Sequence, residues 1–226
     1  MTQAGNATYS GPEDLPATVP VFPLAGVLLL PRGHLPLNIF EPRYVEMIDE
    51  AMRTSRLIGM IQPALPKAVS PNGTPELADV GCLGRIVQYA ETGDGRFVIT
   101  LMGVSRFKVA SEIPAKRPFR IARIDIAPFA DDLVTGKGEG NVDRKTLLDT
   151  FRAYLEARNL EADWSSIEKA SNESLVNTLS MMAPYGPAEK QVLLEADTLK
   201  ARADMLVALT ELTLANEARD NGSSLQ

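Results

Sequence analysis

The sequence is poor in cysteine and histidine, the residue types on which disulfides, soft-metal sites and many nucleophilic active sites depend. It contains one cysteine, Cys82, and one histidine, His34, among 226 residues. A single cysteine excludes both an intrachain disulfide and a zinc site built on cysteines. Cys82 lies in an apolar segment, so we expect a small buried side chain. No sequence feature pairs His34 with a nucleophile, so we expect a solvated turn histidine. The sequence therefore predicts no catalytic residue, no cofactor and no metal.

Long apolar runs and basic charge are also scarce. The longest apolar stretch, around residues 27–30, is far shorter than the roughly 20 residues that span a bilayer. The net charge of −6 disfavours nucleic acid as a partner, because sequence-independent binding requires Lys and Arg to neutralise phosphates. Residues 1–17 have neither the basic region nor the apolar core of a signal peptide. We therefore expect a cytoplasmic protein without a membrane partner, and a flexible tail over residues 1–17.

The first patterned segment of the sequence, residues 19–44, is apolar and is interrupted by several prolines. Interior prolines exclude one long helix, because each removes a backbone donor and clashes with the preceding turn. The segment predicts short strands joined by tight turns. Pro42 suits the first turn of a helix, and apolar residues then recur at helical spacing, which predicts a helix over residues 42–54.

The next part of the chain alternates apolar and polar residues, as strands do. We expect strands over residues 57–61, 82–90, 96–102, 104–110 and 119–126. Asp94-Gly95 predicts a hairpin turn, and Gly103 predicts a bulge or bend. The proline-rich residues 63–79 predict a long surface loop and a candidate for mobility. Several short antiparallel strands with bends at glycines favour a barrel-like sheet.

The composition changes at residues 134–140, where three glycines alternate with polar residues. This predicts a flexible linker over residues 131–141, between a β-rich domain (18–130) and a helical bundle (142–219). Ser165 to Glu168 matches a capping box. We expect one last helix from Pro187 with an apolar seam, and a flexible tail over residues 220–226.

Several short motifs, in this order and spacing, carry a resemblance to a known family. They lie at residues 19–24, 31–37, 81–87, 94–95, 103–107 and 190–195, with Arg202. Together they resemble the N-terminal substrate-binding (LON) domain of the ATP-dependent Lon proteases, over roughly residues 19–215. Residues 38–44 are more similar to stand-alone bacterial LON-domain proteins. The resemblance implies an α+β fold, with a PUA-like β-barrel followed by a helical bundle. In Lon this region helps to recognise unfolded or tagged substrates and to assemble the hexamer.

The catalytic parts of Lon are not carried over by this resemblance. The sequence has no G-x-x-x-x-G-K-[ST] phosphate loop, because Gly136-Lys137 is followed by Gly138. Nothing follows residue 226 that could hold a Ser–Lys protease domain, so we expect a protein that is not an enzyme. Cereblon-like proteins place a LON domain beside a cysteine-based zinc module, which one cysteine excludes here.

Six residues are candidates for binding a partner. They are Phe40, Glu41, Arg43, Tyr44, Arg85 and Arg106. In the structural alternative, Glu41 stabilises the helix N-terminus, Tyr44 packs in the core and Arg43 forms an ion pair. The two strand arginines line a concave anion or peptide site, or they pair with Glu91, Asp125 or Glu112.

The leading hypothesis is a non-catalytic module that binds unfolded or specific polypeptide and serves as an adaptor or in protein quality control. An exposed apolar groove or sheet edge would capture extended chain by strand addition. The alternatives are an RNA-binding PUA-like protein and a small-ligand-binding protein. The oligomeric state and any joint action with a Lon protease stay open.

Overall fold

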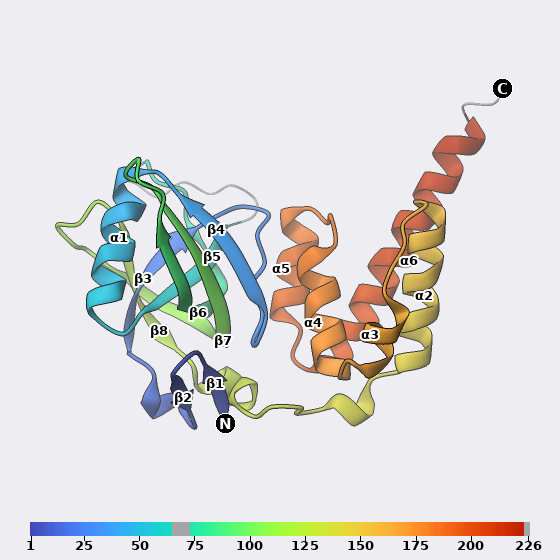
Figure 1. The fold of residues 1–226 in the computed structure, drawn as a ribbon, viewed down its shortest axis with the longest axis horizontal. Helices are drawn as coiled ribbons and strands as arrows, with labels where there is room; N and C mark the ends of the chain where they lie inside the picture. Colours follow the sequence, from blue (N-terminus) through green and yellow to red (C-terminus); the bar gives the residue numbers. More distant parts are fainter. Residues whose placement is uncertain (65–72, 224–226) are drawn as a thin grey trace. The chain divides into compact units, whose positions relative to one another are not determined.

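The computed structural model describes residues 1–64 and 73–223, and it divides into two compact units (Figure 1). The barrel unit comprises Met1–Thr135 together with Pro184–Leu194, and the helical unit comprises Gly136–Ala183 and Glu195–Gln226. The chain therefore leaves the barrel unit, forms helices, and returns to it for one short segment. The domain boundaries expected from the sequence placed this segment in the helical bundle.

A closed β-barrel forms the first unit. Its ring runs in the order β7–β6–β5–β3–β8, and pairing of β8 with β7 closes it. Strand β4 pairs with β7 outside the ring. All pairings in this sheet are antiparallel except that of β3 with β5. The strands are β3 (Thr18–Pro23), β4 (His34–Ile39), β5 (Leu57–Pro63), β6 (Leu77–Glu91), β7 (Phe97–Ile113) and β8 (Arg120–Asp125). The predicted barrel-like sheet is confirmed.

Gly103 lies inside one long strand, β7, where two strands were expected. The β6–β7 register shifts there, because Leu83 opposes Ser105 whereas Gly84 opposes Gly103, which leaves Val104 as an extra residue. A Cβ atom on Gly103 would lie 2.0 Å from the carbonyl oxygen of Leu30. The predicted bulge is confirmed, and the missing side chain lets the segment before β4 cross the strand closely.

Helix α1 (Pro42–Arg53) follows β4, as predicted. Pro42 occupies the first turn, where its missing N–H costs nothing. The buried face carries Tyr44, Met47, Ile48 and Ala51. These apolar side chains recur at helical spacing, so one stripe of the helix is buried and the rest is polar.

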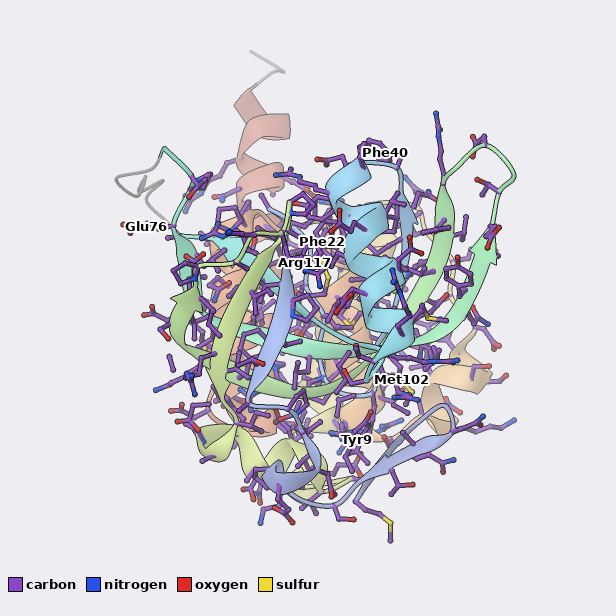
Figure 2. The ribbon with its side chains drawn as sticks, turned by 90° about the vertical axis from the view of Figure 1, so that its left-hand side faces the viewer. Tyr9, Phe22, Phe40, Glu76, Met102 and Arg117 are labelled. Atoms are coloured by element: carbon purple, nitrogen blue, oxygen red, sulfur yellow. The ribbon has the colours of Figure 1, made fainter. Side chains whose placement is uncertain are left out.

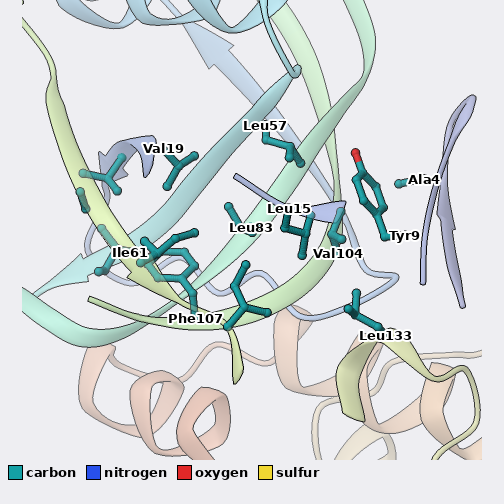
Figure 3. Close-up of a cluster of buried hydrophobic side chains, with 14 of the residues drawn as sticks. Ala4, Tyr9, Leu15, Val19, Leu57, Ile61, Leu83, Val104, Phe107 and Leu133 are labelled. Carbon is teal, nitrogen blue, oxygen red and sulfur yellow. The ribbon is translucent and has the colours of Figure 1, made fainter. Parts of the chain in front are cut away.

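The N-terminal residues form a hairpin, so the expectation of a flexible tail over 1–17 was wrong. Strands β1 (Thr2–Ala4) and β2 (Ala7–Tyr9) pair antiparallel and are followed by the short 3-10 helix η1 (Pro12–Asp14). Ala4, Tyr9 and Leu15 join a buried apolar cluster with barrel side chains that include Leu57 and Leu83 (Figure 3). This apolar burial holds the segment in place.

The expected linker over residues 131–141 is largely structured. The 3-10 helix η2 (Ala127–Leu133) belongs to the barrel unit, where Leu133 is buried in the same cluster. The 3-10 helix η3 (Glu139–Asn141) belongs to the helical unit. There the carboxylate of Glu139 accepts a hydrogen bond from the Glu173 amide at 2.8 Å. The glycine content alone predicts flexibility. The segment is fixed because the Glu139 carboxylate binds an amide in the first turn of a later helix, which has no partner within that helix.

The helical unit consists of helices with polar N-caps. Asp143, Asp163 and Ser171 each accept hydrogen bonds from backbone amides of the first turn. The expected capping box at Ser165 was misplaced, because Ser165 lies inside a helix that Asp163 caps. The helices are α2 (Arg144–Ala157), α3 (Trp164–Lys169), α4 (Asn172–Met182) and α6 (Leu199–Ser223).

The predicted last helix from Pro187 is two helices. Helix α5 (Pro187–Glu195) ends before Thr198, whose side-chain oxygen accepts a hydrogen bond from the Ala201 amide at 3.0 Å and so starts α6. Because α6 extends to Ser223, the tail expected from residue 220 is helical at its start. Residues 224–226, and residues 65–72 of the expected mobile loop, lie outside the described residues.

Helix α5 is bound to the barrel by side-chain amides. Gln62 on β5 donates to the Pro187 carbonyl and to the Gln191 side chain, at 3.0 Å each. Gln191 donates in turn to the Val80 carbonyl on β6 at 3.1 Å. Lys190 donates to the Gly26 carbonyl at 2.9 Å, and burial lowers the pKa of its amine. These bonds explain why the segment returns to the barrel unit.

The Gly103→Ala variant should unfold far more easily than the wild type. The added methyl group meets a backbone carbonyl, so the backbone must move to relieve the clash, and overpacking costs about 1–3 kcal/mol. Urea unfolding followed by circular dichroism measures the loss. Gly140→Ala is the control, because no atom lies within 4 Å of its Cβ position. Equal stability of the two variants would contradict the close crossing.

The helical unit should lose stability in acid through its aspartate caps. Hydrogen bonds from the side chains and amides of Ser166 and Ser165 lower the pKa of Asp163 below its usual value of 3.8. The carboxylate therefore stabilises the folded state above that value, and this contribution disappears as the pH falls through the lowered pKa.

Asp163→Asn keeps a capping oxygen but does not titrate. The variant should show a smaller fall in stability between pH 6 and pH 3 than the wild type, by urea unfolding followed through Trp164, the single tryptophan. An identical pH dependence in both proteins would exclude Asp163 as a contributor.

Candidate functional site

Strand β4 is an edge strand of the described sheet. It pairs with β7 from His34 opposite Met102 to Ile39 opposite Phe97, and the part of the chain that the structure describes places no strand on its other side. Pro36, which has no N–H, is tolerated because it lies on an edge. An edge strand presents unpaired backbone groups to which a further extended chain can bind.

Exposed apolar side chains lie at the C-terminal end of β4. Phe40 follows the strand directly and is 64% exposed. Val98 on β7 is 40% exposed and lies opposite Asn38, so these two residues share a face of the sheet. Figure 2 shows Phe40 at the start of α1, and Tyr9 at the far end of the barrel in that view. We call the β4 edge together with Phe40 and Val98 the edge surface.

The other candidates at the start of α1 divide into surface and core. The Arg43 Nε donates to the Glu41 carboxylate at 2.9 Å, and both side chains are about half exposed. The Arg43 guanidinium also lies 4.5 Å from the centre of the Tyr44 ring. Tyr44 is buried and its ring contacts Phe22 at 4.1 Å between centroids. Burial raises the pKa of the Tyr44 hydroxyl. Tyr44 thus has the packing role of the structural alternative, whereas Phe40, Glu41 and Arg43 remain accessible.

Arg106 is internal and does not present its charge to a partner. It is 5% exposed, and its guanidinium donates to both carboxylate oxygens of Asp132, at 2.8 and 2.9 Å. A further N–H donates to the Leu194 carbonyl at 3.1 Å, and the group lies 4.5 Å from the Phe129 ring centre. The sequence-based suggestion of Arg106 as a partner-binding residue is therefore corrected. Its counterion is Asp132 on η2, and none of the acidic residues suggested from the sequence; Glu112 pairs with Arg120 instead.

Arg85 lines a concave pocket of about 370 Å³ in the barrel unit. One of its terminal nitrogens donates to the Ser55 carbonyl at 2.7 Å and to the Tyr9 hydroxyl at 3.2 Å. A second arginine, Arg56, also lines the pocket, and sequence reasoning missed it. The complete lining is Gly5, Asn6, Arg56, Arg85, Ile86 and Val87.

The single cysteine and the single histidine lie on different strands of the barrel unit. Cys82 is buried in β6, as expected. His34 is exposed at the start of β4 rather than in a turn. Within residues 1–64 and 73–223, no group of three or more His, Cys, Asp or Glu side chains could hold a metal ion. No described helix is both long and apolar enough to cross a membrane.

Comparison with known families decides the classification. Residues 18–211 match the model of the ATP-dependent protease La (LON) substrate-binding domain. The chain belongs to this family. The LON substrate-binding domain thus covers the barrel and most of the helices, and it is the domain that the sequence motifs suggested.

Curated relatives are Lon proteases of several bacteria. The chain is 27% identical to the Lon protease of Anaeromyxobacter dehalogenans over 87% of its own length, and 26% identical to Lon protease 2 of Myxococcus xanthus over 87%. It spans only 23% and 24% of the length of these relatives. The similarity therefore concerns one region of a longer enzyme.

Solved structures show the same fold. The Lon N-terminal domain protein from Xanthomonas campestris has a TM-score of 0.56 at 21% identity, covering 84% of this chain and 97% of that one. The N-terminal domain of the Mycobacterium avium complex Lon protease has a TM-score of 0.61 at 17% identity, covering 86% and 98%. These likenesses support the barrel-and-helix architecture of the LON substrate-binding domain.

Asp132→Ala should destabilise the barrel unit strongly, because it leaves the buried charge of Arg106 without its counterion. Removal of one partner of a buried pair costs about 3–5 kcal/mol. Glu41→Ala breaks an exposed pair and should cost less than about 1 kcal/mol. Urea unfolding compares the two variants. The double variant Arg106→Met with Asp132→Leu should recover part of the loss, and similar small losses for both single variants would refute a structural role for the ion pair.

Proposed function

We propose that this LON substrate-binding domain is a non-catalytic module that captures extended polypeptide at the edge surface. The observation that carries the proposal is the outer edge of β4, which pairs with no other described strand, with exposed Phe40 beside it. The family is also named for substrate binding. The relatives that the chain matches are Lon proteases, whose substrates are polypeptides. We also propose a role as an adaptor or in protein quality control in the cytoplasm. For the fold, we propose that the barrel is PUA-like and that the helices form a bundle.

The edge surface combines the two kinds of contact that sequence-tolerant peptide binding needs. Backbone hydrogen bonds along an edge strand do not depend on the sequence of the added chain. Apolar side chains on the bound chain would cover Phe40 and Val98, and full burial of a side chain such as phenylalanine contributes about 1.5–3 kcal/mol. Because Pro36 lacks an N–H, β4 offers an interrupted ladder, which favours reversible capture over permanent sheet extension.

Glu41 and Arg43 border this surface. Their exposed ion pair is worth little to stability, so both side chains can re-pair with charges on a bound chain at small cost. We therefore assign Phe40 as the anchor, and Glu41 and Arg43 as adaptable neighbours. Arg106 and Tyr44 have no part in this surface.

The test is fluorescence anisotropy of the purified chain with a labelled, reduced and alkylated unfolded protein. The wild type should bind saturably. The double variant Phe40→Ser with Val98→Lys should bind about tenfold more weakly, because it removes an apolar anchor and places a charge on the outer face. Met182→Ser is the matched control, because Met182 is 77% exposed and lies in the helical unit.

Equal affinities of the edge variant and the control would refute the edge surface as the binding site. Absence of any binding by the wild type would refute the polypeptide-binding function itself. Displacement of the polypeptide by single-stranded RNA, with affinity falling steeply as salt rises, would instead favour the RNA-binding alternative.

A further inference from the structure

The pocket lined by Arg56 and Arg85 is built from three separate parts of the barrel unit. Gly5 and Asn6 form the turn of the β1–β2 hairpin, Arg85 to Val87 belong to β6, and Arg56 lies between α1 and β5. Gly5 has a φ of +56°, which the tight hairpin turn requires. The position of the pocket thus depends on the N-terminal hairpin, whose Tyr9 hydroxyl fixes the Arg85 side chain.

The charge in this pocket is unbalanced. Two of its six lining residues are arginines and none is acidic, in a chain whose net charge is −6. The Arg85 guanidinium donates hydrogen bonds to a carbonyl and a hydroxyl, both neutral. Considering the described residues only, neither Arg56 nor Arg85 forms an ion pair with a carboxylate. The pocket therefore concentrates positive charge beside a partly apolar wall of Ile86 and Val87.

Arg56 adopts a backbone conformation that disfavours arginine. Its φ is +59°, in the left-handed region that glycine and asparagine adopt with less strain at helix ends. Two backbone hydrogen bonds of 2.8 Å hold it there, one from its N–H to Ala51 and one from Ile86 to its carbonyl. Backbone strain of this kind clusters at functional sites.

The pocket also lies in register with the edge surface. Arg85 opposes Met102 on β7, and Met102 opposes His34 at the start of β4. Directly opposite residues share a face of the sheet, and neighbouring strands lie about 4.8 Å apart, so the path from Arg85 to His34 is about 10 Å. A chain bound antiparallel to β4 would bring its carboxyl end to this side of the barrel.

We propose that Arg56 and Arg85 form a carboxylate-binding pocket for bound polypeptide, an inference that rests on the proposed function. Guanidinium groups bind carboxylates through paired N–H donors. The only anionic groups of an unmodified polypeptide that fit are its terminal carboxylate and its Asp and Glu side chains. The Asn6 amide and the aliphatic wall add a neutral donor and an apolar contact. The edge surface alone would bind different polypeptides with similar affinity. The pocket would let the domain select those with a carboxylate in the right position.

The experiment measures NMR chemical-shift changes of the pocket residues when small probes are added to the full chain. The probes are N-acetylvaline, which has a terminal carboxylate, its amide, which has none, and the α-amide of N-acetylglutamic acid, which has only a side-chain carboxylate. The signals are the backbone amides of Gly5, Asn6 and Val87 and the Nε–H groups of Arg56 and Arg85. Saturable shifts with a carboxylate probe and none with N-acetylvaline amide are expected.

Arg56→Asn is the test variant, because asparagine tolerates the left-handed conformation while the charge is lost. It should weaken binding of the carboxylate probe about tenfold. Arg53→Asn is the matched control, because Arg53 is exposed at the end of α1, does not line the pocket and carries the same charge. Arg85→Lys keeps the charge but loses the planar fork, and it should also weaken binding.

The outcomes separate the pocket from the proposed function. Shifts with N-acetylvaline only make the terminal carboxylate the ligand, and shifts with the glutamate probe only make side-chain carboxylates the ligand; both support the pocket. Equal shifts with N-acetylvaline amide, or wild-type affinity in Arg56→Asn, would refute the carboxylate pocket. Neither result would affect the proposed binding of unfolded protein at the edge surface. If the carboxylate probes bind but no unfolded protein does, the polypeptide function fails and the pocket remains.

Discussion

The buried ion pair between Arg106 and Asp132 is the interaction on which the barrel unit depends. It joins β7 to η2, and through the Leu194 carbonyl it also joins the end of α5. A buried guanidinium is stable only when its donors and charge are satisfied. These partners lie 26 and 88 residues away in the chain, so the pair requires η2 and α5 to return to the barrel together. Together with the bonds of Gln62, Lys190 and Gln191, this explains why a helix from the second half of the chain belongs to the first unit.

Closure of the barrel leaves β4 outside the ring, as an edge strand of the described sheet. The ring satisfies the backbone groups of its strands through their neighbours, which removes most edges from the described sheet. The bulge at Gly103 and the close crossing at Leu30 position the start of β4 against β7. Phe40 at one end of β4, and the two-arginine pocket in register with the other end, then mark the ends of one surface. A single fold constraint thereby produces both proposed binding features.

Much of the barrel could be predicted from local patterns. Alternation predicted the extended residues of β7, although as two strands, Pro42 predicted the start of α1, and Gly103 predicted the bulge. Each of these features depends on residues close in sequence. The N-terminal hairpin also had a signal, since Gly5-Asn6 between alternating residues is a two-residue turn. That signal is weak, because each strand has only three residues and so shows little alternation. Among the candidate binding residues, Phe40 is exposed and Arg85 lines a pocket, but the interior positions of Tyr44 and Arg106 depend on contacts that no local pattern encodes.

By itself the sequence determined the family, the β-rich and helical halves, and the presence of only one cysteine and one histidine. These properties follow from composition, periodicity and motif order, which are local or additive along the chain. Only the tertiary structure decided that Asp132 is the counterion of Arg106, that α5 binds the barrel through Gln62 and Gln191, and that Arg56 joins Arg85 in one pocket. An apolar face or a charge in the sequence predicts that the side chain has a partner elsewhere in the chain. It does not specify which residue that partner is, because burial and ion pairing do not depend on position in the sequence. Closure of the barrel brings the actual partners together.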